Sequence, residues 1–145
     1  MEVEWLILAD AAQVIGNKLY LLGGGWDRLM VNSGFPVDQQ IGLAASFKVP
    51  WNETNEKHTF EVEIASEDGE SICTIGGGFE VGRPPGIPAG QDQRMQIAAN
   101  AGLRIKDQGT YVIIARIDGQ EGRRVPFNVV AGATMAMGQG GRQQG

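Results

Sequence analysis

Glycine-rich turns that interrupt short apolar runs are the feature that most constrains the fold of this chain. Of its 145 residues 22 are glycines, and they recur between short segments of apolar or alternating side chains. No segment shows the sustained i, i+3, i+4, i+7 apolar spacing of an amphipathic helix. Short strands separated by such turns are typical of antiparallel sandwiches and barrels. The sequence therefore predicts an all-β protein.

One hairpin is legible from side-chain alternation. Phe60, Val62 and Ile64 fall on one face of residues 58–65, and polar side chains alternate with them. The Asp-Gly signal in 66–70 then predicts a turn into a partner strand at 71–75.

A second hairpin is predicted from 110–117 and 123–130, with the DGQEG segment between them. Pro126 lacks a backbone donor. We therefore expect the last strand to lie at a sheet edge or to carry a bulge.

The remaining apolar runs predict further strands. Residues 3–10 are apolar on both faces, which favours a central strand, and 14–22 hold a Gly-Asn turn between two β-rich pieces. The runs 41–49 and 94–102 each predict one strand. We expect about eight strands in a two-sheet antiparallel sandwich.

A short motif narrows the class of sandwich. Residues 103–113, LRIKDQGTYVI, contain Asp-x-Gly-x-Tyr at the entry to a strand. The motif resembles the tyrosine-corner region of immunoglobulin-like domains, and the resemblance implies that the Tyr111 hydroxyl bonds backward to loop backbone. Ile113 stands where antibody domains place their second cysteine. The fold prediction is an immunoglobulin-like sandwich, with a jelly-roll or C2-like sandwich as the alternative.

The chain divides into a sandwich domain, residues 1–130, and a tail, residues 131–145. The tail, AGATMAMGQGGRQQG, consists of small and polar residues with one charge. Such a segment buries too little surface to offset its ordering entropy, so we expect a flexible tail. The alternative is a tail that docks on a neighbouring subunit, because ATMAM is apolar enough to join a strand edge.

The charge and hydropathy of the chain exclude several classes of partner. Twelve basic residues against 17 acidic ones give a net charge of −5, which argues against nucleic acid. No apolar run approaches the roughly 20 residues that cross a bilayer. Glu2 and Glu4 stand where a signal peptide carries basic residues. We expect a cytoplasmic protein with no nucleic-acid or membrane partner.

Metal binding and catalysis find little support. Cys73 is the only cysteine and His58 the only histidine, so no disulfide and no Cys/His zinc set is available. A Ser-His-Asp or Cys-His arrangement would rest entirely on His58. Its place at the start of a predicted strand favours a capping or surface role. We expect no metal, no cofactor and no enzyme.

The best candidate for a recognition surface is the loop 50–57. Trp51 offers a broad apolar face, and Glu53 and Asn55 supply hydrogen-bonding groups beside it, as in sugar and peptide sites. His58 and Arg83 complete the predicted binding set. In the alternative, Trp51 folds back over the sheet edge as a lid on the core.

Residues 76–93, GGGFEVGRPPGIPAGQDQ, predict a stiff connection between the two sheets. The prolines and glycines fix an extended, turning path with few backbone donors. Arg83 precedes Pro84, which biases its backbone to extended geometry. We expect Arg83 to pair with an internal carboxylate.

Three segments resemble an uncharacterised family of small bacterial proteins along residues 3–130: LILADAAQVIGNKLYLLGGGWDRL, VPWNETNEKHTFEVEI and FEVGRPPGIPAG. The resemblance implies a bacterial, single-domain, non-secreted protein and supplies no activity.

Two hypotheses about function remain open. The first is a non-enzymatic binding or self-assembly module that associates through strand edges or the tail. The second is a small-molecule or carbohydrate-binding domain, or a hydrolase, with its site around residues 50–58.

Overall fold

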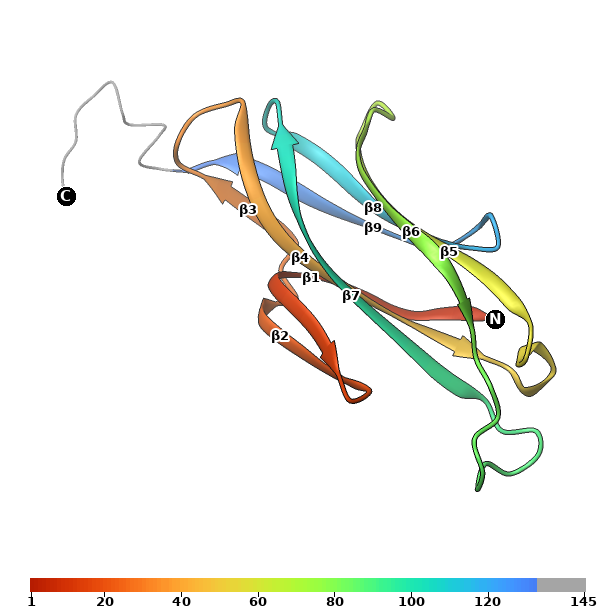
Figure 1. Cartoon of the computed structure of the whole chain (residues 1–145). Coiled ribbons are helices and arrows are strands. Elements are labelled where there is room, and N and C mark those ends of the chain that lie inside the picture. The colour runs from red at the N-terminus through yellow and green to blue at the C-terminus, as the bar shows by residue number, and fades with distance from the viewer. Residues whose placement is uncertain (133–145) are drawn as a thin grey trace.

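The computed structural model describes residues 1–132, which form two sheets packed face to face (Figure 1). The first sheet has the order β2 (Lys18–Gly24), β1 (Glu2–Ile15), β4 (Val37–Val49), β7 (Gln93–Ile105). The second has the order β3 (Arg28–Val31), β9 (Gln120–Ala131), β8 (Gly109–Ile117), β5 (Lys57–Ser66), β6 (Ser71–Glu80). A short 3₁₀ turn, η1 (Trp51–Glu53), follows β4. The predicted all-β, two-sheet sandwich is confirmed, and the short β3 is a strand that the sequence did not indicate.

One apolar core lies between the sheets. Phe47 of β4 is fully buried and stacks on Phe79 of β6, with ring centroids 5.8 Å apart. Phe127 of β9 packs against Tyr111 of β8 at 5.7 Å. The largest buried aliphatic side chains come from both sheets: Ile41, Leu43, Ile64, Leu103, Ile105 and Ile113. Burial of this apolar surface is the main force that holds the layers together.

Both predicted hairpins, β5–β6 and β8–β9, form, but the β8–β9 turn has fewer residues than the DGQEG segment indicated. Asp118 and Gly119 both have positive φ, at 51° and 83°, so two residues complete the turn and β9 begins at Gln120. Pro126 pairs with Val112 of β8, and β3 pairs with β9 only from residue 128 onward. Pro126 therefore lies at a locally unpaired edge, as expected.

The N-terminal strand is central, as predicted, because β1 lies between β2 and β4. Gly16 and Asn17 form its two-residue turn into β2, with φ of 56° and 63°. Two left-handed residues in a two-residue loop match the right-handed twist of the flanking strands.

This hairpin, residues 10–24, leaves the plane of the first sheet. Ile41 and Leu43 face the core, so Gly42 faces outward, and a Cβ there would lie 2.7 Å from the Cα of Ala11. Asn100 of β7 donates from Nδ2 to the Ala12 carbonyl and accepts from the Ala12 N–H at Oδ1, both at 2.9 Å. The hairpin thus rests on the outer face through β1, and its turn is tied to β7 because Gln96 Nε2 donates to the Asn17 carbonyl at 2.9 Å. β2 forms the outer edge of this hairpin (Figure 1). We call residues 10–24 the projecting hairpin.

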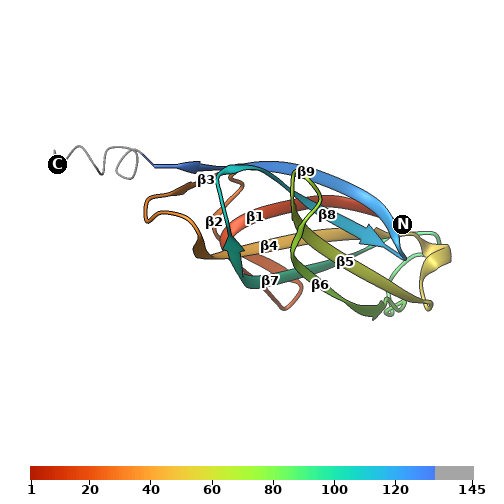
Figure 2. The same cartoon turned by 90° about the horizontal axis from the view of Figure 1, so that it is seen from above.

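The proline-rich segment connects β6, an edge strand of the second sheet, with β7, an edge strand of the first. The predicted connection between sheets is confirmed. Gly86 and Gly90 have φ of 93° and 83° where the chain turns back. In both views this connection, η1 and the N-terminus lie at one end of the sandwich, whereas β9 ends at the other (Figure 2).

The Tyr111 hydroxyl donates to the Asp107 carbonyl at 2.6 Å, the backward bond that the tyrosine-corner resemblance implied.

The predicted tail falls largely outside the described residues: Ala131 ends β9, the Gly132 N–H bonds the Val31 carbonyl at 2.8 Å, and 133–145 are not described. The division at residue 130 stays a prediction. No helix within residues 1–132 has the length and apolar character to span a bilayer.

Candidate functional site

All five residues of the predicted binding set gather at one end of the sandwich. Trp51 and Glu53 lie in η1, Asn55 follows it, and His58 enters β5. Arg83 reaches them from the β6–β7 connection, with its guanidinium carbon 4.0 Å from the centre of the Trp51 ring. Sequence reasoning therefore identified residues that are neighbours in space.

His58 is buried, so the expected surface role is wrong, whereas its bond to the carbonyl of Glu53, the last residue of η1, is compatible with the expected capping role. Its Nδ1 lies 2.9 Å from Asp118 Oδ2, and its Nε2 lies 2.8 Å from the Glu53 carbonyl oxygen. Both partners are hydrogen-bond acceptors, so this geometry favours the imidazolium form, in which both ring nitrogens donate. Burial opposes this charge, but the bonds to Glu53 and Asp118 outweigh it and raise the pKa of His58.

Asp118 is a residue of this site that the sequence did not reveal. It stands in the β8–β9 turn, where its Oδ1 also accepts the Thr59 N–H at 2.9 Å. The hydrogen bonds from Thr59 and His58 lower the pKa of this carboxyl. The usable signal was the Asp-Gly turn that follows β8. This strand pairs with β5, which contains the only histidine of the sequence.

Among residues 1–132 Arg83 does not pair with a carboxylate, so the expectation of an internal carboxylate partner was wrong. Its Nε donates to Thr54 Oγ1 at 2.5 Å and its Nη2 to the Trp51 carbonyl at 2.7 Å. The stiff connection places the guanidinium over an aromatic ring and beside neutral acceptors, and a cation is attracted to the face of that ring. Arg83 therefore holds η1 and the following turn against the β6–β7 connection.

The turn after η1 is closed from both sides. Thr54 is buried, and its hydroxyl donates to the Trp51 carbonyl at 2.6 Å. Asn55 adopts a left-handed φ of 60° and donates its N–H to the Val81 carbonyl at 2.7 Å. We call the set Trp51, Glu53, Thr54, Asn55, His58, Arg83 and Asp118 the loop clamp. Within it His58, Thr54 and Arg83 bind other members of the set, and the Glu53 carboxylate pairs with the Met1 amino group at 3.1 Å. These internal contacts are typical of a structural role. The ligand-binding hypothesis for these residues stays a prediction.

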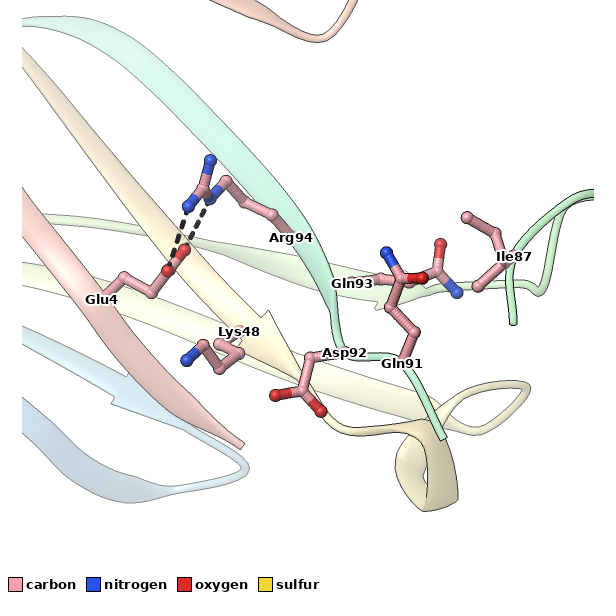
Figure 3. A pocket seen from close by; sticks show the side chains of 7 residues that line it. All are labelled: Glu4, Lys48, Ile87, Gln91, Asp92, Gln93 and Arg94. Atoms are coloured by element: carbon pink, nitrogen blue, oxygen red, sulfur yellow. Dashed lines mark hydrogen bonds and ion pairs between the residues drawn. The ribbon is translucent and has the colours of Figure 1, made fainter. Parts of the chain in front are cut away.

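A hollow of about 370 Å³ lies beside the clamp on the outer face of the first sheet (Figure 3). Its wall is the pair of Arg94 on β7 with Glu4 on β1, Nε to Oε1 at 2.7 Å, which spans the intervening β4. The hydrogen bonds from Arg94 and from buried Ser46 lower the pKa of Glu4 to about 2. This wall holds three strands together, and sequence reasoning missed it because its members are distant in the chain.

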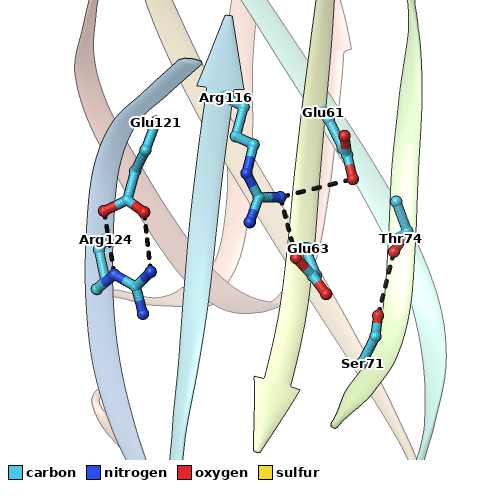
Figure 4. A network of polar contacts seen from close by, with 7 residues as sticks. All are labelled: Glu61, Glu63, Ser71, Thr74, Arg116, Glu121 and Arg124. Carbon is cyan, nitrogen blue, oxygen red and sulfur yellow. Dashed lines mark hydrogen bonds and ion pairs between the residues drawn. The ribbon is translucent and has the colours of Figure 1, made fainter. Parts of the chain in front are cut away.

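The outer face of the second sheet carries a ladder of opposite charges (Figure 4). Arg116 Nη1 lies 2.9 Å from Glu63 and 3.5 Å from Glu61, and Arg124 pairs with Glu121 at 2.8 Å. Cross-strand pairs of this kind support a solvated sheet face. No group of three or more His, Cys, Asp or Glu within residues 1–132 is placed to hold a metal ion.

The surface that lacks internal partners is on the projecting hairpin. Tyr20 and Leu22 of β2 are 52% and 71% exposed, and Ile15 at the turn is 54% exposed. Leu21 is 37% exposed as well, although it is on the other face of the strand. The available signal was the run KLYLL, which is apolar at consecutive positions. Side chains at consecutive positions of a strand point to opposite faces, so they cannot all be buried against one surface.

Residues 4–130 match the model of a family described as Family of unknown function (DUF6941). The match confirms the resemblance seen in the three quoted segments. A comparison with curated proteins finds no match.

Proposed function

The chain belongs to that family of unknown function, and we propose that it is a non-enzymatic binding or self-assembly module that acts through β2. One observation carries the proposal. β2 is the outer edge strand of a hairpin that lies on the outer face of the first sheet, and it exposes Tyr20, Leu21 and Leu22 together.

An exposed apolar edge strand is a surface that soluble proteins normally protect. Its unpaired backbone groups accept a further strand, and natural proteins shield such edges with charges, prolines or bulges. Within Lys18–Gly24 the only charge is Lys18, at the first position. The strand therefore offers both ladder hydrogen bonds and apolar side chains to a partner, which is the β-augmentation mode of recognition.

The loop clamp supports the non-enzymatic part of the proposal. His58 spends both ring nitrogens on Asp118 and Glu53, so neither nitrogen is available as a general base. Arg83 similarly directs Nε and Nη2 at Thr54 and Trp51.

Photo-crosslinking in cells tests this function. The full chain would carry p-benzoylphenylalanine in place of Tyr20, or, as a control, in place of Thr74, an exposed residue on the edge strand of the other sheet. We expect protein adducts from position 20 and none from position 74. Absence of adducts from position 20, or equal adducts from both, would remove the support for β2 as the binding surface.

We further propose the immunoglobulin-like strand order for this sandwich. The neighbours β1-β4-β7 and β6-β5-β8-β9 correspond to strands A-B-E and C′-C-F-G of that class, with β2 and β3 as additions. Tyr111 then stands near the start of the strand that carries the tyrosine corner. An experimental structure with a jelly-roll or C2-like order would contradict this assignment.

A cytoplasmic location is also proposed. It is supported by the single cysteine, Cys73, because a lone thiol needs no oxidising compartment. Export of the chain fused to a reporter that is active only outside the cytoplasm would contradict it.

A further inference from the structure

We propose that the partner of β2 is a second copy of this chain, paired antiparallel through β2 with the two-fold axis at Leu21. The inference rests on the proposed function, because it names the occupant of the same edge. It follows from the backbone pattern and the side-chain sequence of the projecting hairpin.

The backbone groups of Leu21 face away from β1. Leu21 is the register partner of Ala12, and Ala12 gives its N–H and carbonyl to the Asn100 side chain. The pair Ala12–Leu21 is therefore of the non-hydrogen-bonded kind, in which neither residue bonds the other. The N–H and carbonyl of Leu21 consequently point to the open edge of β2, and those of Leu19 do the same by alternation.

The open edge is complementary to itself. With the axis at Leu21, this residue and its equivalent in the second copy exchange both hydrogen bonds. Tyr20 then lies opposite Leu22 of the second copy, at a position where the Cα atoms approach to about 4.5 Å. An aromatic side chain beside an aliphatic one is a favourable cross-strand pair, and the symmetry makes it twice. These side chains are lateral neighbours on one face and shield part of each other's apolar surface. The arrangement is isologous and closes at two copies.

Sedimentation equilibrium of the full chain tests the dimer. We expect a mass that rises with concentration toward twice 15.5 kDa. Tyr20→Glu should raise the dimer dissociation constant about 30-fold or more, the effect of losing one interface hot spot. Met30→Glu is the matched control, because Met30 is 56% exposed but lies on β3, and it should leave the constant unchanged. A wild-type mass that stays at 15.5 kDa would overturn the proposal.

A cysteine crosslink tests the register. The L21C variant, made in a Cys73→Ser background, places two thiols at the axis, where hydrogen-bonded partners are about 5.5 Å apart at Cα, within the range of about 4.4–6.8 Å for disulfides. We expect a disulfide-linked dimer on mild oxidation and none from M30C in the same background.

Two outcomes separate this inference from the proposed function. Adducts from position 20 that contain only other proteins, with a monomeric wild type, would overturn the second copy and keep β2 as a binding surface. A dimer that survives Tyr20→Glu but is lost on removal of residues 133–145 would assign the contact to those residues and overturn the β2 pairing.

Discussion

The loop clamp and the projecting hairpin differ in how completely their chemical groups find partners inside the chain. The clamp contains the residue types that usually signal a site, a histidine, an arginine and a tryptophan. His58 and Arg83 nevertheless direct their hydrogen bonds at neighbouring loops. The hairpin contains unremarkable apolar residues, and Leu22 is 71% exposed.

The difference shows that residue type alone is a poor guide to function. A reactive side chain whose partners are internal stabilises the fold, whereas an apolar side chain left in water on a free strand edge marks an interaction surface. If this distinction holds, substitutions in the clamp change stability and those on β2 change association.

The largest loss of stability should follow His58→Ala. Removing this buried ring leaves the Glu53 carbonyl and Asp118 without their donor and creates a cavity next to Phe79, whose ring is 5.5 Å away. We expect a loss of about 3 kcal/mol in the free energy of unfolding, measured by urea denaturation. Lys57→Ala, at the exposed neighbouring position, is the control and should change little. A His58→Ala protein as stable as the wild type would show that His58 does not stabilise the clamp.

A smaller loss is expected from Asn100→Ala, which breaks the attachment of the hairpin. Two hydrogen bonds to Ala12 disappear, so we expect a loss of about 2 kcal/mol. Faster amide exchange confined to residues 11–22 would accompany it. Asn100→Asp keeps an acceptor for the Ala12 N–H but loses the donor, and an equal effect of both variants would contradict the two-way bond.

Arg83→Ala should cost about 1 kcal/mol. Its side chain is exposed, where stacking on an aromatic ring is worth about 0.5–1 kcal/mol, and its hydrogen bond to the Trp51 carbonyl is open to water. The check is again urea denaturation, with Arg123→Ala on β9 as the exposed control. If Arg83→Ala instead abolished the binding of a sugar or peptide and left stability unchanged, the clamp would be a ligand site.

The smallest effect should come from pH, because deprotonation of His58 leaves the ring packed. The pKa of His58 is raised above 6.5 in the folded state, so its contribution is fully present below pH 6.5 and is lost as pH rises through the folded-state pKa. The stability difference between wild type and His58→Gln should therefore shrink in alkaline buffer. A difference that grows with pH would show that the ring is neutral in the fold.

The fold was largely accessible from the sequence, because alternation and turn signals are local. The Gly16–Asn17 and Asp118–Gly119 turns follow from the left-handed conformations that these residue types tolerate. β3 was missed because four residues, Arg28–Val31, carry no alternation and form a strand only through parallel pairing with β9.

Five of the seven clamp residues were predicted from the sequence, but their contacts were not. Loop residues 51–58 and Arg83 could be grouped from their composition, yet the partner of His58 comes from a turn 60 positions away. The predicted partner of Arg83 was wrong because a carboxylate was expected on charge alone. The fold instead places a hydroxyl, a carbonyl and an aromatic face beside the guanidinium. Exposure of β2 depends on the close approach of β1 to Gly42 at Ala11, which no local pattern encodes.

The dimer dissociation constant of three full-length proteins, wild type, Tyr20→Glu and Arg83→Ala, tests the central claim most directly. Sedimentation equilibrium should give the same constant for wild type and Arg83→Ala and a constant about 30-fold higher or more for Tyr20→Glu. A dimer weakened by Arg83→Ala and untouched by Tyr20→Glu would place the interaction surface at the loop clamp and contradict the account.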